Sequence, residues 1–282
     1  RIRSANSGGC EAYAVRVNNS ILVNSSGTHN DSLVDTPTNY GEDTGLGGEV
    51  RGNYCTLNPL SATHAASSTL TNGNLDFYAG TGNGYKYTWG TIGVTKGKWY
   101  YEVECLTQGS NTNMGWPGVQ KGELKNADPF WTGGISNQWG VQTQNWKKTN
   151  NNSQTEDYMA DTTSGAAGDV IGCALDMDNG KIWWSKNGVW GDNNTGTAGD
   201  PAAGSGEAFS NLLTVLPGEA VHPMECHYGS TGKNTYNFGQ RAFKYTAPTG
   251  FKCLCTQNLD DLFSGDELNN PSKYFDVTTW TG

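Results

Sequence analysis

Two carboxylates in the stretch "GDVIGCALDMDNGKIWWSKNGVW" (168–190) stand close enough in sequence to do chemistry together. Asp176 and Asp178 form a D-x-D-x-G arrangement, which can offer oxygen ligands to calcium or an acid and a base to a reaction. An EF-hand loop needs more oxygen ligands and a closing bidentate Glu, whereas a lysine and an apolar run follow here. Asn179-Gly180 is the dipeptide that two-residue hairpin turns favour. The stretch therefore favours a hairpin turn over a calcium site, and a calcium site over catalysis.

Glu102 and Glu104 in "YYEVEC" form a second pair of carboxylates, and strand alternation puts both side chains on one face. A retaining glycosidase needs two carboxylates roughly 5 Å apart, so this pair could serve such a reaction. The E-x-D-x-x-E signature of glycosidases built on a β-sandwich is absent, however. We therefore interpret both glutamates as ordinary residues of a half-exposed strand.

Histidines and cysteines show no spacing that predicts a metal site. His222 and His227 are separated by five positions, which puts their side chains on opposite faces of a strand. The seven cysteines form no C-x-x-C pair, and we expect them to be buried thiols in reducing surroundings. Cys253 and Cys255 would share a strand face, near the upper separation for a disulfide. Without a G-x-S-x-G elbow, a P-loop or an H-E-x-x-H motif, the sequence predicts no catalytic residue, metal or cofactor.

The elements that must position these residues are strands. The chain of 282 residues contains 39 glycines, ten tryptophans and 13 tyrosines, with 16% charged residues, a composition typical of all-β proteins. Turn signals such as "TNGN", "TKGK" and "STGKN" separate apolar runs at short intervals, and no run has a helical period. We expect an antiparallel β-sandwich or barrel, with strands over the runs "KWYYEVEC", "QWGVQT", "DVIGCALDM", "KIWWSK", "AVHPMECHYG" and "TYNFG".

Charge and hydropathy restrict the partners. The formal net charge is −9 and the isoelectric point is about 4.9, which argues against nucleic acid or an anionic membrane surface as a partner. No stretch approaches the roughly 18 consecutive apolar residues of a membrane span, so we expect no membrane insertion. The chain begins at an arginine, and we expect it to be an excerpt of a longer polypeptide.

Composition changes along the chain predict four parts. Residues 1–24 contain two short alternating strands around an Asn-rich turn, which we interpret as a hairpin and the end of a preceding module. Residues 25–69 are polar and irregular, and we expect an extended arm anchored by Tyr40, Tyr54, Leu57 and Leu60. Residues 70–256 hold the regularly spaced strands of the sandwich. Residues 257–282 read as a polar linker into a following module, with a short helical turn at "LDDLF".

The strand-rich part resembles a SPRY domain. The matching segments occur in the order of that family: "GKWYYEVE" (97–104), "MGWPGVQ" (114–120), "WGVQT" (139–143), "GDVIGCALDMDNGKIWWSKNG" (168–188) and "YNFGQRAFKYTAPTGFKCL" (236–254). The resemblance covers residues 70–256 and implies a bent sandwich of two antiparallel sheets, close to the concanavalin-like jelly-roll layout. It also implies that loops at one end of the sandwich recognise partners.

The flanking segments resemble connecting segments of large virion proteins of tailed bacteriophages. "DTPTNY", "NYCTLNPLS", "TLTNGNL" and "PSKYFDVTTWTG" carry this resemblance. It implies a structural and binding module of a tail fibre or another appendage, located in the virion, an extracellular particle assembled in the host cytoplasm. The implied partners are other virion subunits and a host-surface glycan or protein, and we expect a homo-oligomer.

Aromatic residues in Gly- and Asn-rich segments are the candidate binding residues, because rings beside amides and carboxylates suit sugar faces and protein anchors. Two alternatives to this non-catalytic role stay open, a polysaccharide-degrading enzyme on the same fold and a cytosolic SPRY adaptor that binds peptides. Trp139, Trp183 and Trp184 lie within strands, and we expect them to pack in the core or on a sheet face. The candidate binding residues are Trp116, Phe130, Trp131, Trp146 and Trp190.

Overall fold

The structure is a computed structural model, and it divides the chain into two compact units, Arg1–Glu42 and Asp43–Gly282. The first unit contains one antiparallel pair, β1 (Arg16–Val17) with β2 (Ser20–Ile21), within the region predicted to form a hairpin. The boundaries of the four predicted parts stay predictions. The residues that the structure describes are 16–17, 20–21, 46–47, 52–60, 68–82, 84–109, 115–122, 136–151, 153–160, 163–229 and 231–259.

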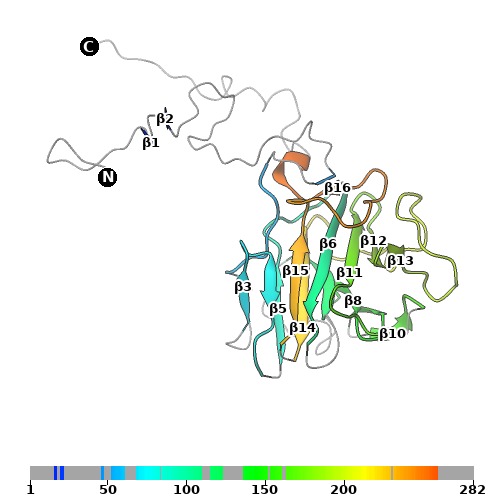
Figure 1. The fold of residues 1–282 in the computed structure, drawn as a ribbon. Helices are drawn as coiled ribbons and strands as arrows, with labels where there is room; N and C mark the ends of the chain where they lie inside the picture. Colours follow the sequence, from blue (N-terminus) through cyan, green and yellow to red (C-terminus); the bar gives the residue numbers. More distant parts are fainter. Residues whose placement is uncertain are drawn as a thin grey trace, which may run out of the picture. The chain divides into compact units, whose positions relative to one another are not determined.

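The second unit is a sandwich of two sheets, as the sequence predicted, and its strands are antiparallel except for one short parallel pairing (Figure 1). The six-stranded sheet has the order β10-β9-β8-β7-β14-β5. Its strands are β5 (Tyr85–Trp89), β7 (Trp116–Lys121), β8 (Gln138–Gln142), β9 (Lys147–Asn150), β10 (Ser153–Asp157) and β14 (Val221–Tyr228).

The eight-stranded sheet has the order β13-β12-β11-β6-β15-β4-β3, and Figure 1 shows β15, β6 and β11 side by side at its centre. The eighth strand, β16 (Lys252–Cys253), runs parallel to the start of β6. Among the described residues the only helix is a 3-10 turn at Thr256–Asn258. The other strands are β3 (Thr69–Thr71), β4 (Asp76–Tyr78), β6 (Lys98–Thr107), β11 (Val170–Asp176), β12 (Lys181–Lys186), β13 (Val189–Trp190) and β15 (Lys233–Asn237).

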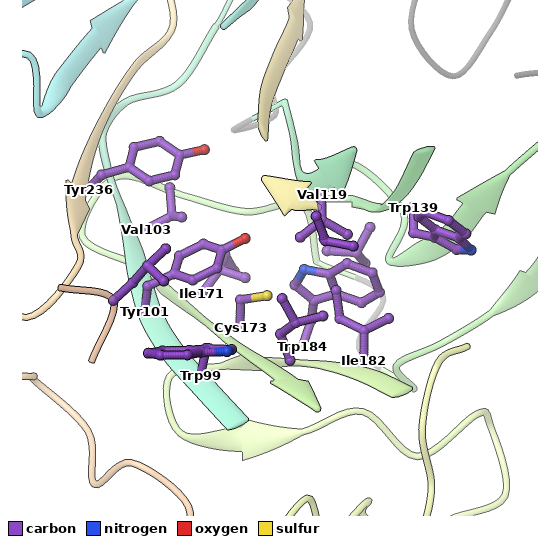
Figure 2. Packing of buried hydrophobic residues seen from close by; sticks show 14 of the residues in the cluster. Trp99, Tyr101, Val103, Val119, Trp139, Ile171, Cys173, Ile182, Trp184 and Tyr236 are labelled. Atoms are coloured by element: carbon purple, nitrogen blue, oxygen red, sulfur yellow. The ribbon is translucent and has the colours of Figure 1, made fainter. Parts of the chain in front are cut away.

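The core lies between the two sheets and is rich in aromatic rings. Figure 2 shows Trp184, Tyr101 and Cys173 of the eight-stranded sheet opposite Val119 and Trp139 of the six-stranded sheet. All five side chains are at most 1% exposed, and the Tyr101 hydroxyl donates to the Gly118 carbonyl oxygen across the interface at 3.0 Å. The expectation that the strand tryptophans pack inside is confirmed for Trp139, Trp183 and Trp184.

The hairpin between β11 and β12 is longer than the sequence predicted. Asp176 pairs with Lys181, so the connection holds four residues, and among these only Gly180 has a positive φ, of 68°. Asp176 Oδ1 accepts the backbone N–H groups of Asp178 and Asn179, each at 3.0 Å, and this side-chain bridge accounts for the wider turn. The expected two-residue turn is therefore wrong at this place, although the hairpin itself is confirmed.

The segment before β3 contributes to the sandwich through isolated bridges. Tyr54 pairs with Cys255 and Leu57 pairs with Gly90, and the Leu57 side chain is fully buried. Leu57 is thus an anchor, as predicted. Leu60 is 92% exposed and is not an anchor, because the chain turns outward after the last bridge. Tyr40 and most of "LDDLF" lie outside the described residues.

All six cysteines that the structure describes are buried thiols and none is in a disulfide, which confirms the expectation for them. The two sulfur atoms of Cys253 and Cys255 are 3.9 Å apart. Burial raises the pKa of Cys55 to about 11 and that of Cys173 to about 12, so these groups stay protonated at neutral pH. Cys10 lies outside the described residues.

Residues 239–253, here called the C-terminal strap, cross the outer face of the eight-stranded sheet. Phe243 and Phe251 of the strap pack with Tyr100 and Trp183 of the sheet, and the Tyr100 and Phe243 rings are 4.8 Å apart. Glu102, only 2% exposed, accepts the backbone N–H groups of two consecutive strap residues, each at 2.8 Å. Glu102 therefore holds the strap on the sheet.

We expect Glu102→Ala to lower the free energy of unfolding by about 1 to 3 kcal/mol, because two part-buried N–H groups of the strap lose their acceptor. Urea denaturation measures this change, and faster amide exchange at Lys244 and Tyr245 would locate it in the strap. The matched control is Glu104→Ala, which removes a partly exposed ion pair with Lys244 and should cost less than about 1 kcal/mol. Equal losses in the two variants would contradict the role given to Glu102.

Candidate functional site

An aromatic cluster covers the outer face of the six-stranded sheet where β5, β7 and β14 meet. Alternation along β5 and β14 turns Tyr85, Tyr87, Cys226 and Tyr228 away from the other sheet, and Trp116 is paired with Cys226. Three of these rings, those of Tyr85, Trp116 and Tyr228, are here called the aromatic triad. The triad comes from three strands that are distant in sequence but adjacent in the sheet.

The Tyr85 ring contacts the other two rings of the triad. The Tyr85 ring lies 4.9 Å from the Tyr228 ring and 6.1 Å from the Trp116 ring, with interplanar angles of 54° and 52°. Both tyrosines are half-buried, whereas Trp116 is only 4% exposed. Within the described part of the chain the Trp116 Nε1–H finds no acceptor, which is uncommon for a buried indole. The triad thus combines two accessible rings with an unused hydrogen-bond donor.

Lys86 holds the two chain segments that border the triad. Its side chain is fully buried on the inner face of β5, and its Nζ donates to the carbonyl oxygen of Gly82 at 2.6 Å and to that of Gly229. The backbone adds a further tie, because the Thr231 N–H donates to the Gly80 carbonyl oxygen at 2.8 Å. Burial lowers the pKa of the Lys86 ammonium. One buried cation therefore joins the segment before Tyr85 to the segment after Tyr228.

We expect Lys86→Met to keep the apolar stem in place and to lower the free energy of unfolding by about 1 to 3 kcal/mol, because one buried and one part-buried carbonyl group lose their donor. Amide exchange should accelerate first at Gly229 and Thr231. As a control, Lys233→Met removes a partly exposed ion pair with Asp76 and should change stability by less than about 1 kcal/mol. If the amide exchange rates of Gly229 and Thr231 are the same in Lys86→Met as in wild type, Lys86 does not hold the two segments together.

A buried carboxyl group lies behind the triad, between the sheets. Glu225 is fully buried on the inner face of β14, and its oxygens accept from Asn234 Nδ2 at 3.0 Å and from the Tyr236 hydroxyl at 2.5 Å. Burial raises the pKa of Glu225 from 4.5 to about 8, although both hydrogen bonds oppose the change. The group is therefore mainly protonated in the folded protein at neutral pH.

This raised pKa predicts how stability depends on pH. The folded state holds the Glu225 proton more tightly than the unfolded state, so the stabilisation is complete below about pH 4.5 and is lost as pH rises through about 8. Glu225→Gln, a neutral isostere, should flatten the fall in unfolding free energy over this window by up to about 1.4 kcal/mol per pH unit. Thermal unfolding measured from pH 5 to pH 9 would show it, with Glu219→Gln, at an exposed position, as control. If the curves of unfolding stability against pH are parallel for wild type and Glu225→Gln, then Glu225 does not carry a proton in the folded protein at neutral pH.

The sequence-predicted aromatic residues fall at separate places. Trp116 belongs to β7 and the triad. Trp146 is fully buried in the core, where its Nε1 donates to the Thr163 carbonyl oxygen at 2.7 Å. Trp190 is half-buried in β13 and packs against Tyr100 on the outer face of the eight-stranded sheet. Phe130 and Trp131 lie outside the described residues.

These positions correct the expectation that the tryptophans present their rings from loops. Trp116 and Trp190 are strand residues, and Trp146 lies in the turn before β9, with its ring buried and a backbone φ of 56°. A fully buried ring cannot contact a ligand unless the core rearranges, so the structure places Trp146 among the packing residues. The binding role of the other candidates stays a prediction.

Sequence reasoning missed both tyrosines of the triad, although the sequence carried a signal for them. Tyr85 and Tyr87 alternate in "NGYKYTWG" directly after a Gly-rich segment, and Tyr228 precedes another at "HYGSTG". Period-two aromatic residues beside glycine turns indicate a strand end with rings on one face. That these two strand ends are hydrogen-bonded neighbours is visible only in the structure.

The carboxylates considered for chemistry all have structural partners. Asp176 is 1% exposed and also pairs with Lys98 at 3.2 Å, while Asp178 Oδ1 accepts the Gly97 N–H at 2.8 Å. In the described ranges no three His, Cys, Asp or Glu residues gather as a metal site would require. No helix in that part of the chain is long and apolar enough to cross a membrane.

Comparison with known families places a SPRY domain match at residues 98–203, which span β6 to β13. Curated proteins that align with this chain include the ATP-dependent RNA helicase DDX1 of Xenopus laevis, 30% identical over 165 residues, and the E3 ubiquitin-protein ligase RKP of Arabidopsis thaliana, 29% identical over 167 residues. The alignments cover 58% and 57% of this chain, but only 18% and 11% of those proteins.

Solved SPRY domains are similar to the sandwich at low identity. The SPRY domain of human HERC1 covers 64% of this chain and 96% of its own, with a TM-score of 0.49 and 20% identity. A second human SPRY domain covers 60% of this chain and 93% of its own, with a TM-score of 0.42 and 15% identity. The sequence match and the two-sheet architecture together support the predicted SPRY β-sandwich.

Proposed function

We propose that the sandwich is a non-catalytic binding module that recognises a segment of a partner protein through the aromatic triad. The observation that carries this proposal is the contact between two half-buried tyrosines above a buried Trp116 whose Nε1–H has no acceptor among the described residues. Tyrosine and tryptophan supply large contact areas at low cost in side-chain entropy and are enriched at the centres of protein interfaces.

A binding role is favoured over the polysaccharide-degrading alternative because the candidate carboxylates are engaged in the fold. Glu102 holds the strap, Asp176 closes the β11–β12 turn and Glu225 is sealed between the sheets. A retaining glycosidase needs two carboxylates open to substrate on one face. Of the pair on β6, Glu102 is 2% exposed, so it is not available for this role without loss of the strap.

A protein partner is favoured over a glycan by the family match and the relatives. Residues 98–203 match the SPRY domain, and the two relatives are an RNA helicase and a ubiquitin-protein ligase. Because the chain covers a small share of either relative, their activities are not carried over. The same reasoning supports the adaptor alternative, in which the module binds peptides on behalf of a larger protein.

Only the flanking segments support the proposal that this protein belongs to a virion. "DTPTNY" and "PSKYFDVTTWTG" lie outside the described residues, and the relatives reported above are eukaryotic proteins. We keep a bacteriophage tail fibre or another appendage as the proposed setting, with a neighbouring virion subunit or a host-surface protein as the partner. Homo-oligomerisation is part of that proposal.

The test compares a random peptide array with a glycan array, each probed with labelled wild type and single-residue variants. We expect wild type to bind a subset of peptides and Tyr228→Ala to lose at least about tenfold in affinity for them, as for removal of an interface anchor. Tyr78→Ala, which removes a half-buried tyrosine of the other sheet, is the matched control and should bind as wild type does. Binding to glycans alone, or equal peptide binding by Tyr228→Ala and wild type, would refute the proposal.

A further inference from the structure

Cys253 and Cys255 bring their sulfur atoms together where the C-terminal strap ends. Their Sγ atoms are 3.9 Å apart, and the two residues are 0% and 1% exposed. A disulfide has a sulfur–sulfur distance of about 2.0 Å, so side-chain rotations that bring the two sulfurs about 2 Å closer would join them. The structure thus holds a reduced dithiol near the geometry of a disulfide.

A tight turn at Leu254 places the two cysteines within reach of each other. In a regular strand, residues two positions apart have Cα atoms about 6.6 Å apart, close to the upper limit for a disulfide. Here the Cys255 N–H donates to the Cys253 carbonyl oxygen at 3.1 Å, a bond between positions i and i+2 that defines a γ-turn and shortens this span. The backbone therefore reduces the separation that the sequence alone suggested.

The side-chain amide of Asn258 contacts Cys253. Its Nδ2 donates to the Cys253 Sγ at 3.1 Å and to the Cys253 carbonyl oxygen at 3.0 Å. A hydrogen bond donated to the sulfur favours the thiolate over the thiol, and the thiolate is the form that reacts with oxidants. This contact favours Cys253 as the nucleophile of the pair.

The turn that carries Asn258 is short and exposed. It is the 3-10 turn Thr256–Asn258, which holds no buried residue and has no side-chain hydrogen bond at its N-cap. Segments with few buried contacts open locally at a low cost in free energy, so opening of this turn takes the Asn258 amide off the sulfur and admits a small oxidant. Cys173, by contrast, lies in the middle of β11 with a strand paired on either side. The Cys253–Cys255 pair is thus reachable without unfolding a sheet.

The turn between the two cysteines joins distant parts of the chain. The Leu254 carbonyl oxygen accepts the Cys55 N–H at 2.9 Å, and the Leu254 N–H donates to the Phe238 carbonyl oxygen at 3.0 Å. Cys255 forms an isolated bridge with Tyr54. One three-residue turn therefore attaches the segment before β3 to the residue that follows β15.

We propose that Cys253 and Cys255 form a redox site. Hydrogen peroxide converts the dithiol to a disulfide, and the closed ring fixes the turn at Leu254, by which the segment before β3 is attached. Reduction by a thiol reopens the ring. The site does not rest on the binding role proposed for the aromatic triad.

The reaction balances in two steps. The Cys253 thiolate attacks one oxygen of hydrogen peroxide, the O–O bond breaks, and the leaving hydroxide combines with the proton that the thiol released to give water. The Cys255 sulfur then attacks the sulfenic acid on Cys253, the S–O bond breaks, and the oxygen leaves as a second water with the Cys255 proton. The two thiols are oxidised by two electrons in total, and one hydrogen peroxide is reduced to two waters.

Peptide mapping tests whether the disulfide forms. The full chain is reduced, freed of reductant, treated with hydrogen peroxide, denatured, labelled with N-ethylmaleimide and digested with trypsin. We expect the wild-type peptide of residues 253–273 to carry no label and to be lighter by two hydrogen atoms than the reduced peptide, and a thiol reductant should reverse the change. Cys226→Ser, which removes a fully buried cysteine of β14, is the matched control and should form the same disulfide.

Amide exchange tests what the disulfide does. The Cys55 N–H, which donates to the Leu254 carbonyl oxygen, should exchange at least about threefold more slowly in the oxidised protein, because the closed ring removes open conformations of the turn. In Cys255→Ala, hydrogen peroxide should leave this rate unchanged. If Cys255→Ala does not fold, Cys253→Ala serves the same purpose, and the wild-type peptide map decides by itself whether the disulfide forms.

Two results would overturn the proposal. Two labels on the wild-type peptide after treatment with hydrogen peroxide, or a bond from this peptide to another cysteine, would show that the pair does not close. An unlabelled peptide combined with an unchanged exchange rate at Cys55 would show that the disulfide forms but does not fix the attached segment.

Discussion

Burial of both faces of the central strands is the constraint on which this structure depends. Every residue of β7, β8 and β11 is buried, so polar groups on these strands depend on partners inside the protein, and the Trp116 Nε1–H is an exception for which the described residues offer no acceptor. Burial of the aromatic core stabilises the fold, and the buried hydrogen bonds fix which segments of the chain lie next to each other. Glu102 and Lys86 are buried and each joins segments that are distant in the chain, and the buried Glu225 joins β14 to β15, the next strand along the chain, which belongs to the other sheet.

This constraint also explains why the carboxylates that suggested chemistry do not perform it here. A catalytic or metal-binding carboxylate needs an oxygen that remains open to substrate or ion. Asp176 and Glu102 direct their oxygens to backbone N–H groups, and in doing so they close a turn and hold the strap. These carboxylates stabilise the fold, and the proposed binding surface is the aromatic triad.

The aromatic triad is built from rings on three neighbouring strands. Lys86 holds the segments that border it, because its ammonium donates to the carbonyl oxygens of Gly82 and Gly229. A buried ammonium can donate to several carbonyl oxygens at once, so it can hold segments that lack a regular ladder of backbone hydrogen bonds.

The sequence by itself determined the strands, their alternation and the SPRY-type sandwich. "VIGCALD" and "KIWWSK" specify strands, and the "DNG" between them specifies a hairpin, because these signals are local in the chain. Only the tertiary structure decided which rings are open: Trp146 is buried, whereas Tyr85 and Tyr228 are half-buried and meet each other. A period of two assigns side chains to faces but does not say which strands are neighbours or what covers a face. Where both faces of a strand are covered, its sequence no longer alternates between polar and apolar residues. The aromatic triad therefore depends on contacts between distant segments, which the local sequence does not reveal.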